Sequence, residues 1–328
     1  MLRITGGQMR YLILVLLAAF ASIAPSTPAL AQQTARYTAP RTEDGHPDLQ
    51  GVWATEFLTT LERPAGVEYL IASQEQAQAL VATLRAQRPA VIDPDVQTHD
   101  IKQLSRVKGE YRTSLIVDPK DGRMPYTQAG LDLAAAVSVR NAQKFDHPEQ
   151  RPLAERCMES LGYAPIRVFR VFLPRQIVQT RDHVVIVSED GVGLRMIHMK
   201  GQPPPDVIRS IEGYSVGHWE RDTLVVQTTH LRAEDPARNV IGRPLLLSRG
   251  STITERFTRV SDGELLYRFT VEDDQLYSQP WTGEFSMTRQ DGPIYEYACH
   301  EGNYSLANSL RGGQAEAARR AEAKRDGR

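Results

Sequence analysis

The sequence predicts a mainly β protein, an antiparallel up-and-down meander of about eight or nine strands that forms a barrel or a strongly curled sheet. Strand-like segments recur roughly every 8 to 14 residues between about 168 and 297, which is the first observation. The second is that short turns separate most of them, such as Arg181-Asp182 and Ser261-Asp262-Gly263. The third is a strict alternation of apolar and polar side chains.

The alternation is clearest in the last two long segments. The segment 264–271 places four apolar side chains on a single face: Leu265, Tyr267, Phe269 and Val271. The segment 281–289 does the same with Trp281, Phe285 and Met287. A period of two with one apolar face indicates strands that bury one side. An immunoglobulin-type sandwich is the alternative, but sequential short turns favour a meander over Greek-key crossings.

Two helices are expected before the strands, at about 74–88 and 127–144. Ser73 is a good N-cap for the first and Gln76 completes a capping box. We expect them to form a helical insertion at about 70–145 within a single β-barrel domain spanning 46–304. A polar, flexible segment at 32–45 precedes this domain, and a helical or disordered tail at 305–328 follows it.

The first 31 residues have the features of a secretory signal peptide. Arg3 and Arg10 supply the positive region, residues 11–23 are apolar, and Ala29-Leu30-Ala31 is a cleavage pattern. No later segment is long and apolar enough to span a membrane. The sequence therefore predicts a periplasmic protein with no stable membrane insertion after signal cleavage.

Composition limits the class of function. The 328 residues carry 39 basic and 40 acidic side chains, a formal charge of -1. A nearly neutral chain lacks the basic field that nucleic-acid binding requires, so we expect no nucleic-acid partner. P-loop, Rossmann and nucleophile-elbow motifs are missing from the sequence, as are His-x-His and Cys-x-x-Cys pairs. We therefore expect no organic cofactor and no metal.

The only two cysteines are Cys157 and Cys299. An oxidising compartment favours one structural disulfide between them. The alternative makes Cys299 a metal ligand or a nucleophile next to His300 and Glu301.

The C-terminal segment 295–304 is the densest polar and aromatic cluster. Its candidate catalytic residues are Tyr295, His300 and Glu301, and Asn303 is a candidate ligand-binding residue. Imidazole and carboxylate groups exchange protons readily. The alternative is a capped turn held by Cys299.

Two further groups of candidates lie on strands. His183 and Glu189 share one face of a strand, so Glu189 would lie near a pocket mouth if that face is internal; the alternative is solvent exposure. His198, on the next strand, is a candidate ligand-binding residue or a structural histidine.

Glu255 shares a face with Phe257, whereas Arg256, Arg268 and Glu284 form a ladder across neighbouring strands. The ladder is either an outward-facing, solvated ion-pair network or, if it faces inward, a polar lining for a ligand.

The sequence also resembles a large, mostly uncharacterised family of exported bacterial proteins. The motifs that carry the resemblance are Pro-Asp-Leu-x-Gly-x-Trp at 47–53, the segments 117–126 and 217–226, and Tyr-Glu-Tyr-Ala-Cys-His-Glu-Gly-Asn-Tyr at 295–304. His218 and Arg221 depart from the family pattern. The resemblance covers about residues 46–310 and implies export and a single fold, but no reaction. The Gly51-x-Trp53 motif also loosely resembles the one in lipocalin-type barrels, where a Trp closes the barrel floor.

These features predict a periplasmic pocket protein for a partly apolar small molecule. We expect Tyr267 and Trp281 to line the pocket or core. The first hypothesis is a cofactor-free enzyme, a lyase, hydratase, isomerase or hydrolase, with Glu189, Glu255 or Glu284 as base and His300 or Tyr295 as acid. The alternative is a non-catalytic, lipocalin-like binding protein of the cell envelope, and a structural envelope protein without a pocket is the third hypothesis.

Overall fold

The computed structural model describes residues 37–87, 101–169, 172–189, 194–232, 236–238 and 240–327. The predicted signal peptide, residues 1–31, lies outside these ranges, as does the first part of the segment 32–45.

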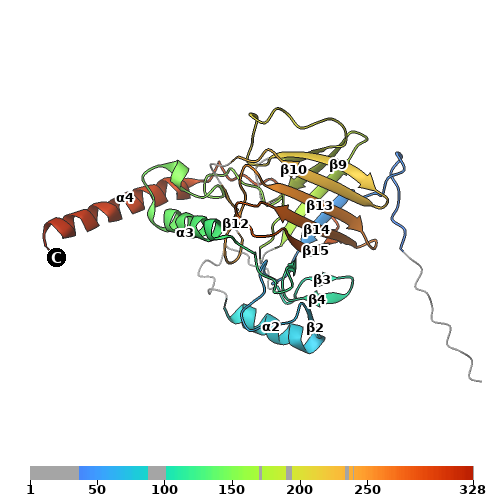
Figure 1. Ribbon diagram of the computed structural model, residues 1–328, viewed down its shortest axis with the longest axis horizontal. Coiled ribbons are helices and arrows are strands. Elements are labelled where there is room, and N and C mark those ends of the chain that lie inside the picture. The colour runs from blue at the N-terminus through green and yellow to red at the C-terminus, as the bar shows by residue number, and fades with distance from the viewer. Residues whose placement is uncertain are drawn as a thin grey trace, which may run out of the picture. The chain divides into compact units, whose positions relative to one another are not determined.

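The described chain is mainly β and contains a closed barrel of nine strands (Figure 1). Around the ring these are β1 (Gly51–Thr55), β6 (Leu173–Gln179), β7 (His183–Ser188), β8 (Leu194–His198), β9 (Tyr214–Glu220), β10 (Thr223–Thr229), β13 (Thr252–Arg259), β14 (Glu264–Glu272) and β15 (Trp281–Gln290). The ring is closed because β1 pairs with β6 on one side and with β15 on the other. A single closed ring replaces the two facing sheets of a sandwich.

The expectation of a purely antiparallel meander is wrong at one place. Strands β8 and β9 pair in parallel, with Ile197 opposite Ser215. The connection between them, residues 199–213, contains Pro203-Pro204-Pro205 and is too long for a hairpin. It carries the chain back to the other end of the barrel before β9 begins, so the barrel is mixed.

The predicted strand at 294–297 is also absent from the structure. Residues 293–298 have no regular secondary structure, and Tyr295 is 72% exposed. The edge of β15 that such a strand would need is occupied by β1, whose Val52 lies opposite Gln290. Strand β1, far away in the sequence, is therefore the one that closes the barrel.

The inner face of the barrel matches the predicted alternation. Leu265, Tyr267, Phe269 and Val271 of β14 are all 2% exposed or less, and they pack in one core cluster with Trp281, Phe285 and Met287 of β15. Trp53 of β1 is fully buried in the same cluster, and its indole N–H donates to the carbonyl of Leu49 at 2.8 Å. Burial of these rings is the main source of the barrel's stability.

A smaller layer with its own core lies between β1 and β6 in the sequence. It contains β2 (Ile71–Ala72), α2 (Gln74–Ala86), β3 (Arg106–Val107) and β4 (Glu110–Arg112), and its core includes Leu58, Leu80, Leu84 and Ile101. The capping box expected at Ser73 and Gln76 is present at the start of α2. Strand β5 (Ile116–Asp118) pairs with Thr282 and Gly283 of β15, on the edge that β1 occupies further along the strand.

The remaining elements are short, apart from two helices. They are α3 (Gln128–Gln143), the 3₁₀ turn η1 (Pro148–Gln150), the pair β11 (Ala237–Arg238) and β12 (Leu245–Leu246), and the C-terminal helix α4 (Tyr304–Arg325). In the described ranges none of the helices has the length and apolar character needed to cross a bilayer.

The predicted disulfide is present. Cys157 and Cys299 are bonded, with their Cα atoms 5.9 Å apart. It fixes the segment that precedes α4 to the segment that follows η1, and both thiols are consumed. The alternative roles for Cys299 as metal ligand or nucleophile therefore do not apply to this structure.

Candidate functional site

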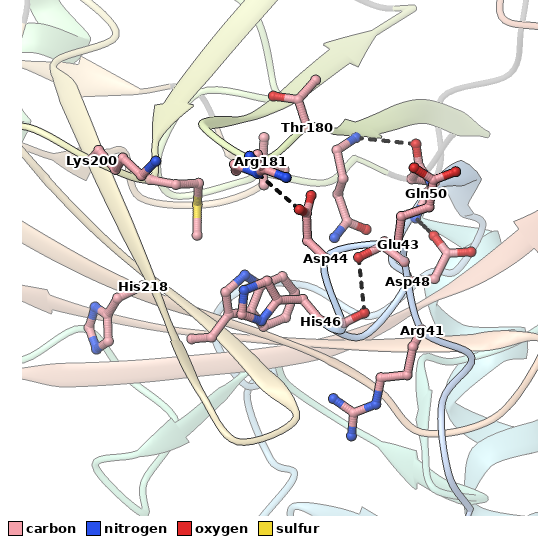
Figure 2. Close-up of a pocket in the computed structure, with 15 residues that line it drawn as sticks. Arg41, Glu43, Asp44, His46, Asp48, Gln50, Thr180, Arg181, Lys200 and His218 are labelled. Atoms are coloured by element: carbon pink, nitrogen blue, oxygen red, sulfur yellow. Dashed lines mark hydrogen bonds and ion pairs between the residues drawn. The ribbon is translucent and has the colours of Figure 1, made fainter.

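A pocket lies at the end of the barrel that carries the β6–β7 and β9–β10 hairpins (Figure 2). We call it the barrel-mouth pocket. It has a volume of about 930 Å³ and is bounded by the loop 41–50, which precedes β1, and by strand ends of β6, β7, β8 and β9. The mouths of barrels are common positions for ligand sites.

The loop 41–50 is shaped by its own hydrogen bonds. Gly45 donates from its backbone N–H to Thr42 O, and Thr42 donates to His46 O, both at 2.9 Å. The side chain of Gln179 on β6 holds the end of the loop, because its amide nitrogen donates to Pro47 O at 3.1 Å and its oxygen accepts from the backbone of Leu49. Residues 41–45, at the end of the segment 32–45, thus belong to a hydrogen-bonded wall of the pocket.

The floor of the pocket is apolar and aromatic. Val184 is 2% exposed and belongs to the barrel core, and Met199 and Trp219 pack against that core from the pocket side. The imidazole of His46 stacks on the indole of Trp219, with ring centroids 5.0 Å apart and planes 7° from parallel. The floor therefore offers a flat apolar surface for part of a ligand.

The rim of the pocket consists of paired charges. Arg181 Nε lies 3.0 Å from Asp44 Oδ1, Arg41 lies 2.6 Å from Asp222, and Lys200 lies 2.7 Å from Asp182. Figure 2 shows Asp44 directed at Arg181 across the top of the pocket. These pairs hold long side chains in place around the opening.

The electrostatics of the rim keep its carboxylates charged. A hydrogen bond from Lys200 and its positive charge lower the pKa of Asp182. Hydrogen bonds from Arg256 and then His218 lower the pKa of Glu220, which lies beside the pocket. Both carboxylates are exposed and have a lowered pKa, so they act as negative groups rather than as proton acceptors near neutral pH.

Three sequence-predicted site residues lie inside the barrel, away from this pocket. Glu255 is fully buried and forms a two-contact ion pair with Arg195, and Tyr267 donates from its hydroxyl to Glu255 Oε1 at 2.6 Å. Trp281 is fully buried in the core. Burial and the Glu255 carboxylate raise the pKa of Tyr267 well above its usual range, so the phenol remains a hydrogen-bond donor.

The arginine–glutamate ladder faces outward, which settles the orientation that the sequence left open. Arg256 lies opposite Arg268 and Arg268 opposite Glu284. Arg256 pairs with Glu220 at 2.7 Å, while Glu284 is covered by the smaller layer and accepts from Arg112 at 3.2 Å. The ladder is an ion-pair network on the barrel's outer wall.

His183 and His198 also lie on the outer wall, since Val184 and Ile186 face the core. Their rings are 5.2 Å apart, and His198 stacks on Tyr214 at 4.6 Å. Glu189 follows β7 and accepts from the backbone N–H of Tyr295 at 3.0 Å. The structure thus brings Glu189 and Tyr295 together, at a small exposed groove.

The other C-terminal candidates lie at the start of α4. His300 and Glu301 are exposed. Asn303 caps α4 by accepting from Leu306 N–H at 3.2 Å, and its amide donates to Glu155 O at 2.9 Å. None of the thirteen candidate catalytic and binding residues lines the barrel-mouth pocket. Among the described residues there is also no group of three or more His, Cys, Asp or Glu side chains placed to hold a metal.

Sequence reasoning missed the residues that form the pocket, above all His46, Trp219, Arg181 and Lys200. The turns Arg181-Asp182 and Arg221-Asp222 lie at the same end because β8 and β9 pair in parallel. A purely antiparallel meander would place these two turns at opposite ends, so the sequence pattern offered no signal for this mouth. A scan against protein-family models finds no matching model, and a search of curated proteins finds no significant match.

Proposed function

We propose that the protein is a periplasmic binding protein that takes a partly apolar small molecule in the barrel-mouth pocket. The observation that carries the proposal is the apolar floor of Val184, Met199 and Trp219 beneath a rim of oriented charges. Ligand sites place an apolar surface beside a few fixed polar groups. Here the apolar part of the ligand would lie on the floor and its polar groups at the rim, whose lining carries both signs of charge: Arg41, Arg181, Lys200, Glu43, Asp44 and Asp48.

Two features support export to the periplasm. The N-terminal residues have the pattern of a signal peptide, and Cys157–Cys299 is a disulfide of the kind that persists in oxidising compartments. The motifs at 47–53 and 295–304 support membership in the exported bacterial family that the sequence resembles.

Binding is favoured over catalysis because the candidate bases are engaged elsewhere. Glu255 is paired with Arg195 in the core, Glu284 with Arg112 under the smaller layer, and Glu189 with the backbone of Tyr295. Acid–base catalysis requires the base within hydrogen-bond reach of the substrate. The carboxylates that line the barrel-mouth pocket are Glu43, Asp44 and Asp48; Asp44 is paired with Arg181, and Asp48 accepts from the backbone N–H of Gln50 at 2.9 Å.

The test uses anilinonaphthalenesulfonate, an apolar anion whose fluorescence rises in an apolar site. We expect saturable binding to the folded protein. Met199→Glu places a negative charge on the pocket floor and should weaken binding roughly tenfold or more, a loss of about 1.4 kcal/mol. The matched control is Met196→Glu, because Met196 is 42% exposed on the outer wall.

The proposal predicts that Met196→Glu binds the dye like the wild type. Near-ultraviolet circular dichroism verifies that both variants keep packed aromatic rings. No binding by the wild type, or equal binding by both variants, would refute the barrel-mouth pocket as the ligand site.

A further inference from the structure

A second pocket, outside the barrel, contains a buried arginine that lacks a counter-charge. Arg63 is 5% exposed. Among the described residues its guanidinium makes one hydrogen bond, from Nη1 to the carbonyl of Glu68 at 3.3 Å, and its Nε is buried without a partner. No described carboxylate lies within ion-pair distance of it. A guanidinium in this position is costly unless an anion accompanies it.

The arginine lines a pocket of about 610 Å³ between α2 and the loop 60–67, which we call the Arg63 pocket. Arg123 lines the same pocket and also forms no ion pair within the described ranges. The one carboxylate in the lining is Glu62, which is already occupied by Arg243 and by the backbone N–H of Met124 at 2.9 Å. The pocket therefore holds two cationic side chains with no anion assigned to them.

The local sequence is built to bring these two arginines together. Gly122 has a φ of +71°, and a Cβ placed there would lie 2.9 Å from Arg63 Cβ. The carbonyl of Gly122 accepts from the backbone N–H of Arg63 at 2.9 Å. Only glycine allows this close approach in this conformation, and it places the next residue, Arg123, at the pocket.

The rest of the lining is largely apolar. The face of α2 contributes Ala79, Leu80 and Leu84, and the opposite wall contributes Val67 and Ile241. An anion with a purely polar body would leave this surface in contact with water. The apolar body of a ligand, about the size of a short hydrocarbon chain, would cover this surface.

We propose that the Arg63 pocket binds an organic carboxylate whose head group pairs with Arg63 and Arg123 and whose apolar body lies along α2. This site is separate from the barrel-mouth pocket and does not depend on the function proposed for it. Arginine is the side chain best suited to a carboxylate, because its guanidinium can donate two parallel hydrogen bonds to one.

The test is calorimetric titration of the full protein with octanoate, with benzoate, with acetate and with octan-1-ol. Octanoate and benzoate share the head group and differ in the body; acetate lacks the body and octan-1-ol lacks the charge. We expect octanoate or benzoate to bind, and acetate and octan-1-ol to bind far more weakly. Arg63→Met keeps the aliphatic stem and should weaken binding roughly thirtyfold or more.

Arg106→Met is the matched control, because Arg106 belongs to β3 of the same layer and its described side-chain interactions are with Gly109 O and the ring of Tyr111, outside the pocket. It should bind like the wild type. If Arg63→Met does not fold, Arg123→Met replaces it and should weaken binding roughly tenfold. No binding of either carboxylate by the wild type, or wild-type affinity in both the Arg63 and Arg123 variants, would overturn the proposal.

Discussion

Two buried arginines, Arg195 in the barrel and Arg63 in the smaller layer, have opposite environments. Arg195 is 2% exposed, and its nitrogens donate to Glu255, Ser215 and Thr228. Arg63 is 5% exposed, and within the described part of the chain its side chain reaches a single backbone carbonyl. Both are removed from water, yet only the first has its charge compensated by the protein.

The difference shows that burial of a charge does not by itself mark a functional site. In the barrel the Arg195–Glu255 network is fully hydrogen-bonded. The hydroxyl of Tyr267 donates to Glu255 and accepts from the backbone N–H of Ile166 at 2.8 Å, so this group also has its partners within the protein. A complete network leaves no donor for a ligand and serves to order the interior. An incomplete one beside a pocket leaves donors for a ligand.

The largest effect should follow from breaking the barrel pair. Glu255→Gln leaves the Arg195 charge buried and uncompensated, and we expect a loss of about 3–5 kcal/mol in the free energy of unfolding. Urea denaturation followed by circular dichroism measures it. Glu220→Gln, which breaks the exposed pair with Arg256, is the control and should cost far less, because water screens the pair. Equal losses in the two variants would contradict a structural role for the buried network.

A smaller effect should follow from removing one hydroxyl of the same network. Tyr267→Phe leaves Ile166 N–H and one oxygen of Glu255 without a partner, and we expect a loss of about 1–3 kcal/mol. Tyr37→Phe removes an exposed hydroxyl bonded to Asp262 and should change stability by less than about 0.5 kcal/mol. The comparison fails if the two phenylalanine variants unfold at the same urea concentration.

The smallest expected effect on stability comes from His198 on the outer wall of the barrel, where water screens charges. Partial burial and then the neighbouring His183 lower the pKa of His198. The unfolded chain therefore binds more protons near pH 6, so this residue's contribution to stability falls as the pH drops through the ordinary histidine pKa of about 6.5. In an NMR titration His183→Gln should raise the pKa of His198. An unchanged value would remove His183 as a cause.

The buried faces of some barrel strands could be predicted from the sequence alone. The alternation at 265–271 and 281–287 predicts the inner face of β14 and β15, and the position of Glu255 beside Phe257 predicts that it shares the buried face. Its partner could not be predicted, because Arg195 lies 60 residues away and is separated from β13 by two strands. Pairing across a barrel interior depends on how the ring closes.

The same reason explains the two errors in the fold and the missed pockets. Ring closure by β1 and the parallel pairing of β8 with β9 depend on contacts between distant segments, which local patterns of five to ten residues do not encode. His46 stacks on Trp219, and Arg63 and Arg123 line one pocket, although the residues of each pair lie far apart in the sequence. Local alternation predicts faces, whereas pockets arise where distant loops converge.

We infer that Arg63 has no counter-charge among the described residues because the carboxylate of a ligand provides it. The most direct measurement is the free energy of unfolding of wild type and Arg63→Met by urea denaturation, with and without octanoate. Without octanoate, the variant should be as stable as the wild type or more stable by about 1–2 kcal/mol, since an apolar side chain replaces an uncompensated charge. With octanoate, only the wild type should gain stability, by mass action. A variant that is destabilised as strongly as Glu255→Gln, or that gains as much from octanoate as the wild type, would contradict the claim.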